Sequence, residues 1–353
     1  MNSSGGYQAS VPLDLPGARG GLPVPVRIVY TERGVGAAGL GWDVPLSYVR
    51  RDTTFARRRP VGTAGVAPQG REQLSVVLDG RRIDLVQTAT AWVARRDAPD
   101  IELRAQADGS WVMFDGQGRT YLFSSPSPAL IGTNLWLLTD VSSAVGSKLH
   151  LDYGISALSL AGGPAISIDL TSVSYNSSPT TTGCYKNTVD LAYDSSGSAP
   201  LSIAVLNGVV MARMHKLTSV DVSGVSACGV TPELIRSYQL AYQADVDTGE
   251  PRLVTVHVVG RAGTLENQTP MPIASYQYGS ASSAVKLVFQ PAGSLPSGFA
   301  NLGNTSKSTA PVSGVGQGYA TALMFTDVTG DGRPDRITFA DGQLSVARNI
   351  SST

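Results

Sequence analysis

The chain has 353 residues, 42% of them hydrophobic, so it can bury a large core and is not a disordered polypeptide. Its 27 basic residues balance its 27 acidic residues, which excludes an overall field that attracts nucleic acid or anionic lipid. No run of about 18 apolar residues is present, which excludes a membrane span of that kind. With 39 glycines and only 15% charged residues, the composition predicts an all-β chain of short strands joined by turns.

The first residues lack the basic segment followed by an apolar segment that marks a signal peptide. If the protein is secreted, we therefore expect another export route or a start that lies upstream of Met1.

A glycine pattern at Gly34, Gly36 and Gly39 follows the apolar run Val26–Tyr30 and matches the dinucleotide-binding fingerprint by spacing. Phosphate binding by that motif needs a helix N-terminus directly after the glycines. Another glycine, a tryptophan and a proline follow within six residues, so no amphipathic helix is expected and we reject nucleotide binding.

Five arginines, at 50, 51, 57, 58 and 59, are dense enough to bind phosphates. The chain is neutral overall, and Asp52 and Glu72 lie nearby in the sequence. We therefore favour a solvated or ion-paired surface over a nucleic-acid site.

Alternating apolar and polar residues predict a series of antiparallel hairpins. Asp79-Gly80 and Asp108-Gly109 each separate two alternating runs, which is a strong hairpin signal. Further strands are expected at 121–123, 135–141, 148–153, 165–175, 188–193, 214–222, 252–259 and 273–278.

The stretch from Thr231 to Tyr242 is compatible with two structures. Leu234, Tyr238 and Tyr242 share helical spacing, whereas the tyrosines and Leu240 also alternate as in a strand. We predict a strand.

Several apolar runs end in tyrosine, at irregular intervals, which indicates successive hairpins along one extended sheet. We expect these extended antiparallel hairpins to form a large curved sheet or sandwich. These runs end at Tyr153, Tyr175, Tyr193, Tyr242 and Tyr278.

Cys184 and Cys228 are too few for a disulfide scaffold or a cysteine zinc site. Each falls in a predicted hairpin loop. A single bridge and two free thiols both fit the sequence.

No catalytic constellation is visible. His150, His215 and His257 lie far apart and outside any zinc or triad motif. We predict that the chain is not an enzyme and has no catalytic residues.

Residues 281–318 are rich in Ser, Gly, Ala and Pro and predict a linker between a domain at 1–280 and a short module at 319–353. Within this module, oxygen-bearing groups recur at alternate positions around Gly332, the arrangement that a Ca²⁺ loop needs. The predicted metal ligands are Asp327, Thr329, Asp331, the Arg333 carbonyl and Asp335.

The residues after this loop read as a strand, an Asp341-Gly342 turn and a second strand, so the calcium loop is expected on a β-hairpin. A metal-free turn is the alternative, but three carboxylates this close would repel one another without a cation. Two strands do not complete a propeller blade, so we expect the module to continue beyond Thr353.

The segment from Val11 to Tyr30, the Gly39-Leu-Gly-Trp42 motif and the arginine pair at 50 and 51 resemble the signature of SpvB-type N-terminal domains. These domains are found in Salmonella plasmid virulence B proteins and in insecticidal toxin-complex B components. The resemblance covers roughly residues 10–280, and Asp108–Trp111, Asp115–Gly118, Leu135–Leu138 and Leu191–Asp194 add to it. The calcium hairpin resembles the start of an FG-GAP/VCBS repeat.

The resemblance implies a structural role in a secreted bacterial toxin complex. In such complexes a hollow shell of Rhs/YD-type strands encloses a C-terminal toxin domain and docks to a translocation pore. Tyr193-Asp194 is similar to one such Tyr-Asp repeat. The implied partners are the pore protein and the enclosed toxin domain, which this chain does not contain. A calcium-dependent cell-surface adhesin or glycan-binding module is the alternative.

Overall fold

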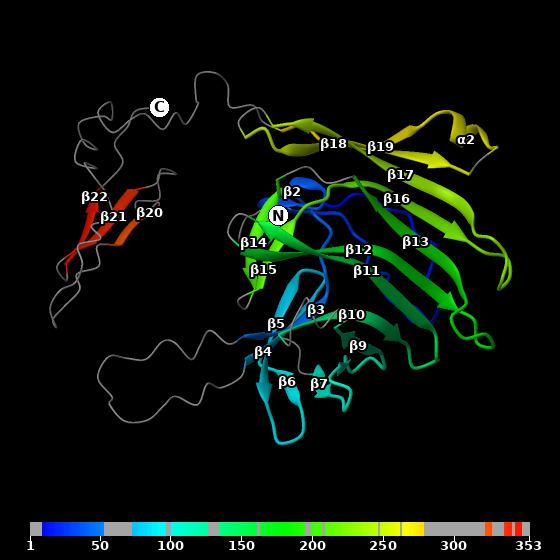
Figure 1. The fold of residues 1–353 in the computed structure, drawn as a ribbon, viewed down its shortest axis with the longest axis horizontal. Helices are drawn as coiled ribbons and strands as arrows, with labels where there is room; N and C mark the ends of the chain where they lie inside the picture. The colour runs from blue at the N-terminus through cyan, green and yellow to red at the C-terminus, as the bar shows by residue number, and fades with distance from the viewer. Residues whose placement is uncertain are drawn as a thin grey trace. The chain divides into compact units, whose positions relative to one another are not determined.

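The computed structural model places the chain in two compact units, Met1–Tyr278 and Gly279–Thr353. Strands make up most of the described structure (Figure 1), and the described helical residues are a turn at Arg19–Gly21 (η1) and a short helix at Leu265–Gln268 (α2). The chain is therefore all-β, as the composition predicts. The described residues are 9–52, 73–96, 100–125, 134–160, 163–194, 199–206, 209–245, 248–261, 263–278, 322–326, 335–340 and 343–347.

The strands β3 to β10 form a closed antiparallel barrel, drawn in blue to teal in Figure 1. Each strand pairs with the next along the chain, and β10 returns to pair with β3, where Trp136 lies opposite Val49. Their bounds are Tyr48–Asp52 (β3), Gln73–Leu78 (β4), Arg81–Gln87 (β5), Trp92–Ala94 (β6), Glu102–Ala105 (β7), Trp111–Phe114 (β8), Thr120–Ser124 (β9) and Leu135–Ser142 (β10).

Alternate side chains of the barrel strands are buried together in one hydrophobic core. A barrel of eight strands encloses a space that its own inward side chains can fill. Trp111 and Trp136 pack edge to face there, with ring centroids 5.7 Å apart. The barrel interior is therefore packed. Its buried residues are Val49, Leu74, Val76, Ile83, Leu85, Trp92, Leu103, Trp111, Met113, Tyr121, Phe123, Trp136 and Leu138.

Strand β10 belongs to two sheets at once. On one side it pairs with β9, while on the other its first residues, Leu135–Leu137, pair with β3. Its last residues, Asp140–Ser142, pair instead with β11. The strand therefore closes the barrel and begins a second sheet.

The second sheet runs in the order β10, β11, β12, β13, β16, β17, β18, β19, and every neighbouring pair is antiparallel. Its long strands are green to yellow in Figure 1. The bounds are Lys148–Leu160 (β11), Gly163–Ser177 (β12), Tyr185–Tyr193 (β13), Leu217–Gly224 (β16), Glu233–Ala244 (β17), Pro251–Gly260 (β18) and Met271–Ser275 (β19).

A hairpin of β14 (Ser202–Leu206) and β15 (Val209–Arg213) is inserted between β13 and β16. It joins the second sheet through a parallel pairing of Met211 with Ile166 on β12. No alternating pattern around 202–213 led us to expect this hairpin.

The N-terminal residues 9–28 and the hairpin of β1 (Val29–Gly36) and β2 (Gly39–Asp43) lie against the second sheet. The Asp14 amide donates to the Tyr238 hydroxyl on β17 over 2.8 Å, and the Arg19 amide donates to the Asn176 side chain on β12 over 2.7 Å. Buried apolar residues of this segment join the same core as the sheet. One face of the sheet is thus covered by the beginning of the chain.

Trp42 anchors this hairpin. Its side chain is 1% exposed, and its ring lies 5.4 Å from Tyr30 and 4.4 Å from Tyr276, measured between centroids. The indole nitrogen donates to the Tyr278 hydroxyl over 2.8 Å. The Gly-Leu-Gly-Trp motif therefore holds the first hairpin to the last residues of the unit.

Several predicted turns and strands are confirmed. Asp79 and Gly80 both have positive φ, as the two-residue hairpin turn requires. The ambiguous stretch is strand β17, and the glycine pattern at 34–39 is the turn between β1 and β2, not a helix start. The strand expected at 214–222 begins later, at Leu217, and the one expected at 273–278 is Met271–Ser275.

The second unit contains three described strands, β20 (Ala322–Thr326), β21 (Asp335–Ala340) and β22 (Gln343–Ala347), paired antiparallel in this order. The two strands predicted after the calcium loop are present, and β20 before the loop is one more than the sequence led us to expect. The predicted linker 281–318 lies outside the described residues.

Across the described residues, the helices are too short and too polar to traverse a lipid bilayer.

Candidate functional site

The predicted calcium loop connects β20 to β21. Thr326, the last residue of β20, lies opposite Asp335, the first residue of β21, so the two ends of the loop are held side by side. The other predicted ligands, Asp327, Thr329, Asp331 and Arg333, lie outside the described residues. A cation site on this hairpin therefore remains a prediction, with Asp335 at the start of a strand.

His150 forms the centre of a polar cluster where β10 leaves the barrel. The imidazole Nδ1 lies 2.8 Å from an Asp140 oxygen on the neighbouring strand, and Nε2 lies 3.4 Å from Asp152. The Tyr185 ring stacks beside the imidazole at 6.5 Å between centroids. These contacts place a titratable side chain between two carboxylates.

The pKa values of this cluster follow from the contacts. The hydrogen bond with Asp140 raises the pKa of His150; partial burial opposes this rise, and the charges of both aspartates add to it. Burial alone would raise the pKa of Asp140, but the bond and charge of His150 lower it overall. The cluster is thus a charge pair that depends on pH.

A second ionic cluster joins β2, β12 and β15. Asp169, with 7% of its side chain exposed, contacts His215 at 2.7 Å and Arg213 at 3.4 Å. Arg213 also reaches Asp43, whose carboxylate accepts the Ala37 amide at 2.8 Å. A buried carboxylate needs such partners, so this cluster ties the first hairpin to the sheet.

The Asp169 cluster lacks the geometry of a nucleophile with its base. The Ser167 hydroxyl donates to Asp169 over 3.4 Å, the same carboxylate that holds His215. A serine nucleophile would instead donate to the imidazole. The cluster is therefore structural in its geometry.

A row of carboxylates and hydroxyls crosses the outer face of the second sheet. Asp152, Ser172, Asp190, Asp221 and Ser237 lie opposite one another in register on five neighbouring strands. The Ser172 hydroxyl donates to Asp152, and the Ser237 hydroxyl donates to Asp221. Burial, together with the charges of Asp221 and Asp152, raises the pKa of Asp190. Among the residues the structure describes, no group of three metal-binding side chains has the geometry for an ion.

A disulfide between Cys184 and Cys228 settles the alternative that the sequence left open. The two Cα atoms are 5.8 Å apart, and the bridge joins the β12–β13 loop to the β16–β17 loop. It links two hairpin tips at one end of the second sheet.

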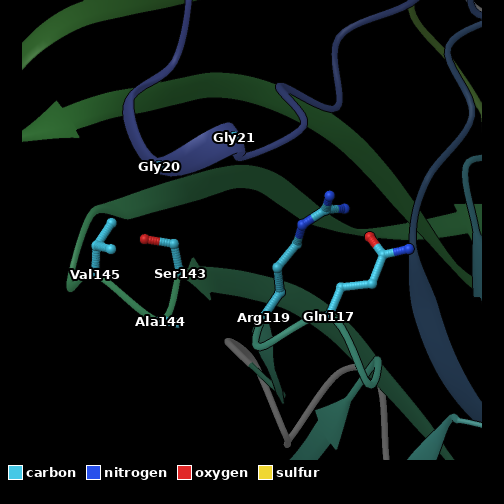
Figure 2. Close-up of a pocket in the computed structure, with 7 residues that line it drawn as sticks. All are labelled: Gly20, Gly21, Gln117, Arg119, Ser143, Ala144 and Val145. Carbon is cyan, nitrogen blue, oxygen red and sulfur yellow. The ribbon is translucent and has the colours of Figure 1, made fainter.

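An open pocket of about 380 Å³ lies between the N-terminal segment, the β8–β9 turn and the β10–β11 turn. Figure 2 shows the Arg119 side chain rising on the side of the Gly20-Gly21 turn, with Gln117 beside it and farther from the turn. Gly20 has a φ of +67°, and an added Cβ there would come within 2.5 Å of the Ser143 hydroxyl, so only glycine fits without a shift. Close packing of this segment on the β10–β11 turn forms the pocket.

The sequence could not identify these clusters, because their members become neighbours only through strand register. The pair of Asp140 and His150 lies ten residues apart on a hairpin, but Asp169 and His215 are separated by 46 residues. The one indication of these clusters in the sequence is the presence of polar residues within apolar strands.

No protein-family model and no curated protein matches the chain. Solved structures do resemble it. The N-terminal domain of effector protein SpvB from Salmonella typhimurium strain LT2 superposes with a TM-score of 0.54 and 16% identity, over 72% of this chain and 99% of that domain.

Two toxin-complex structures cover nearly the whole chain. The crystal structure of TcdB2-TccC3-TEV matches with a TM-score of 0.56 and 16% identity, and the Photorhabdus luminescens Tc holotoxin pore with 0.52 and 14%. Each covers 98% of this chain, which spans 19% of the matched chain's length. At these identities the likeness establishes the fold: this chain has the fold of the SpvB N-terminal domain and of part of the Tc toxin assemblies.

Proposed function

We propose that the chain is a structural scaffold of a secreted bacterial toxin complex, part of a shell that encloses a C-terminal toxin domain located outside this chain. The observation that carries the proposal is the shared fold: 72% of this chain matches 99% of the SpvB N-terminal domain, and the chain matches part of two Tc toxin chains.

The architecture is compatible with a role as part of a protein shell. A closed barrel removes free strand edges, which otherwise attract other chains. The second sheet has one face packed under residues 9–28 and a polar row on the other. Such a layer presents charged and hydroxyl groups to water on the other face.

The disulfide supports an extracellular location. Disulfides persist in oxidising surroundings and are rare in the cytosol. Cys184 and Cys228 are bridged, and their loops lie at the tips of two hairpins.

A passive role is also consistent with the histidines. His150 and His215 each hold carboxylates from neighbouring strands, as expected of links within a sheet. We propose that the chain performs no catalysis and that any toxic activity belongs to the enclosed domain.

We further propose that the second unit begins an FG-GAP/VCBS repeat that binds Ca²⁺ and contributes to docking on a translocation-pore protein. The support is the ligand spacing of the loop and the antiparallel pairing of the strands on both sides of it.

Protease protection tests the shell role. The longest natural protein that carries this chain is fused at its C-terminus to a folded reporter domain, and a second version lacks residues 1–280. We expect the reporter to survive limited proteolysis in the first protein and to be digested in the second.

A version lacking only 319–353 serves as a control for deletion as such, and it should still protect the reporter. Equal digestion of the reporter with and without residues 1–280 would refute the shell role. Calcium-dependent binding to a glycan array without reporter protection would favour the adhesin instead.

A further inference from the structure

Four arginines surround an open pocket of about 350 Å³ on the outside of the barrel. The pocket lies on β5 and the residues directly after β6. Its lining residues are Arg81, Arg82, Ile83, Asp84, Arg95 and Arg96.

Strand alternation and register bring these side chains together. Ile83 and Leu85 are buried in the barrel core. Arg82 and Asp84 alternate with them along β5 and therefore point outward. Leu85 lies opposite Ala94, and the Arg95 amide donates to the Asp84 carbonyl over 2.8 Å. The two arginines at the start of β5 and the two directly after β6 therefore line one pocket.

Arginines outnumber carboxylates among the residues that line the pocket. Asp84 is the single carboxylate among the lining residues, and it already accepts a hydrogen bond from the Arg82 Nε over 2.7 Å. Within the described residues, no carboxylate contacts the side chain of Arg95 or Arg96. Among the described residues, Arg95 and Arg96 therefore supply positive charge that no contacting carboxylate offsets.

The neighbouring tyrosine responds to the same positive field. Burial raises the pKa of Tyr48 on β3, the charges of Arg50 and then Arg82 act against that rise, and the charge of Asp43 adds to it.

We propose that this arginine pocket binds a small multivalent oxyanion of the phosphate class. Guanidinium groups bind phosphate oxygens through paired, charge-assisted hydrogen bonds. A concave site focuses the field of its charges. Several arginines around one pocket therefore attract a multivalent anion more strongly than they attract a single carboxylate. The pocket volume accommodates a group of pyrophosphate size.

Titration of the 353-residue chain with pyrophosphate tests the proposal. Calorimetry and ³¹P NMR are performed at constant ionic strength, with inorganic phosphate and tripolyphosphate for comparison. We expect saturable binding of one anion per chain, tighter for pyrophosphate than for phosphate. In the double variant R95Q/R96Q the affinity should fall at least roughly tenfold, because two charge-assisted contacts are removed.

R104Q is the matched control, since Arg104 is an exposed arginine on β7 that pairs with Glu102 at 2.7 Å. Its affinity should equal that of the unchanged chain, and all variants should keep the same melting temperature. Absence of saturable binding, or an equal loss in R104Q, would overturn the proposal.

Two further titrations separate the sources of the phosphate group. Binding only to vesicles that contain phosphatidic acid, or only to a single-stranded oligonucleotide, would overturn the assignment to a small anion. The proposal does not depend on the shell role, because its readout is binding to the isolated chain.

Discussion

His150 contacts one carboxylate on its own strand and one on the next, so its protonation state affects how β10 and β11 are held together. The pKa of His150 is raised in the folded protein, and therefore its stabilising contribution is complete below the unfolded pKa of about 6.5. The contribution disappears as the pH rises through the folded pKa.

The substitution H150Q should reveal this dependence. At pH 6 we expect the variant to be less stable than the unchanged chain by roughly 0.5–1 kcal/mol, a modest value because the imidazole is 36% exposed and screened by solvent. The difference should shrink at pH 8.5. Urea unfolding at both pH values measures it.

H257Q is the control, because His257 lies on β18, several strands away from Asp140. A stability difference for H150Q that stays constant between the two pH values would contradict the assignment of the effect to ionisation.

At the scale of residues, the sequence identified roles that depend on local geometry. The Asp-Gly turn at 79–80 and the buried Trp42 both follow from short motifs. The ionic partners of His150 and Asp169 depend on pairing between strands, which no local pattern encodes. For the same reason the arginine pocket was not predicted.

The disulfide joins two hairpins across 44 residues of sequence. Closing a loop of this length restricts the unfolded chain, which corresponds to about 4 kcal/mol in the chain-entropy account. We expect the variant C184S/C228S to unfold at a clearly lower denaturant concentration than the oxidised chain. Its free energy of unfolding should be lower by up to about 4 kcal/mol.

Reduction provides the internal comparison. Dithiothreitol should lower the stability of the unchanged chain to that of the double variant and leave the variant itself unaffected. If the oxidised and reduced chains unfold at the same denaturant concentration, the bridge contributes nothing to stability.

The β20–β21 loop carries the predicted calcium ligands, and its metal dependence can be measured directly. Ca²⁺ at a hundredfold excess over its dissociation constant should stabilise this unit by about 2.7 kcal/mol. Chelation should therefore lower its melting temperature, and D331N should abolish the calcium-dependent shift and the heat of calcium binding.

D341N is the matched control, since Asp341 lies in the predicted turn beyond the loop. Its calcium response should equal that of the unchanged chain. A melting temperature that is the same with and without Ca²⁺ would favour the metal-free turn.

At the scale of elements, hairpins with Asp-Gly turns and regular alternation were predicted, whereas strands without them were missed. The β14–β15 hairpin is apolar on both strands, and Ile203 and Val205 are exposed, so alternation gave no signal. The length of β11 was also underestimated, since the strand continues beyond Tyr153 to Leu160, and β12 extends two residues beyond each predicted end.

The barrel and the second sheet share β10, so neither can be dismantled without breaking hydrogen bonds of the other. We expect the first unit to unfold in one transition, with the slowest amide hydrogen exchange in β10 and its neighbours. Exchange measured by mass spectrometry checks this. Separate protection patterns for barrel and sheet would contradict it.

The substitution L138A should test the coupling. Leu138 is 2% exposed, and truncating such a residue costs about 2–5 kcal/mol. Exchange should accelerate in β17 as well as in the barrel, since both belong to one cooperative unit. Faster exchange confined to the barrel would refute the coupling.

At the scale of the whole molecule, the sequence established the all-β class but not the topology. Closure of the barrel depends on the pairing of β3 with β10. The order of the second sheet depends on the pairing of β13 with β16, although β14 and β15 lie between them in the sequence. Both are pairings between distant segments, which the strand patterns alone do not specify.

The covering segment at the start of the chain has a consequence for synthesis on the ribosome. The Asp14 backbone binds the Tyr238 hydroxyl, 224 residues later. At about 5–20 residues per second, translation needs roughly 10–45 s to deliver that tyrosine. During this time the apolar side chains of residues 11–28 have no sheet to cover, so the nascent chain is a natural client for a holding chaperone.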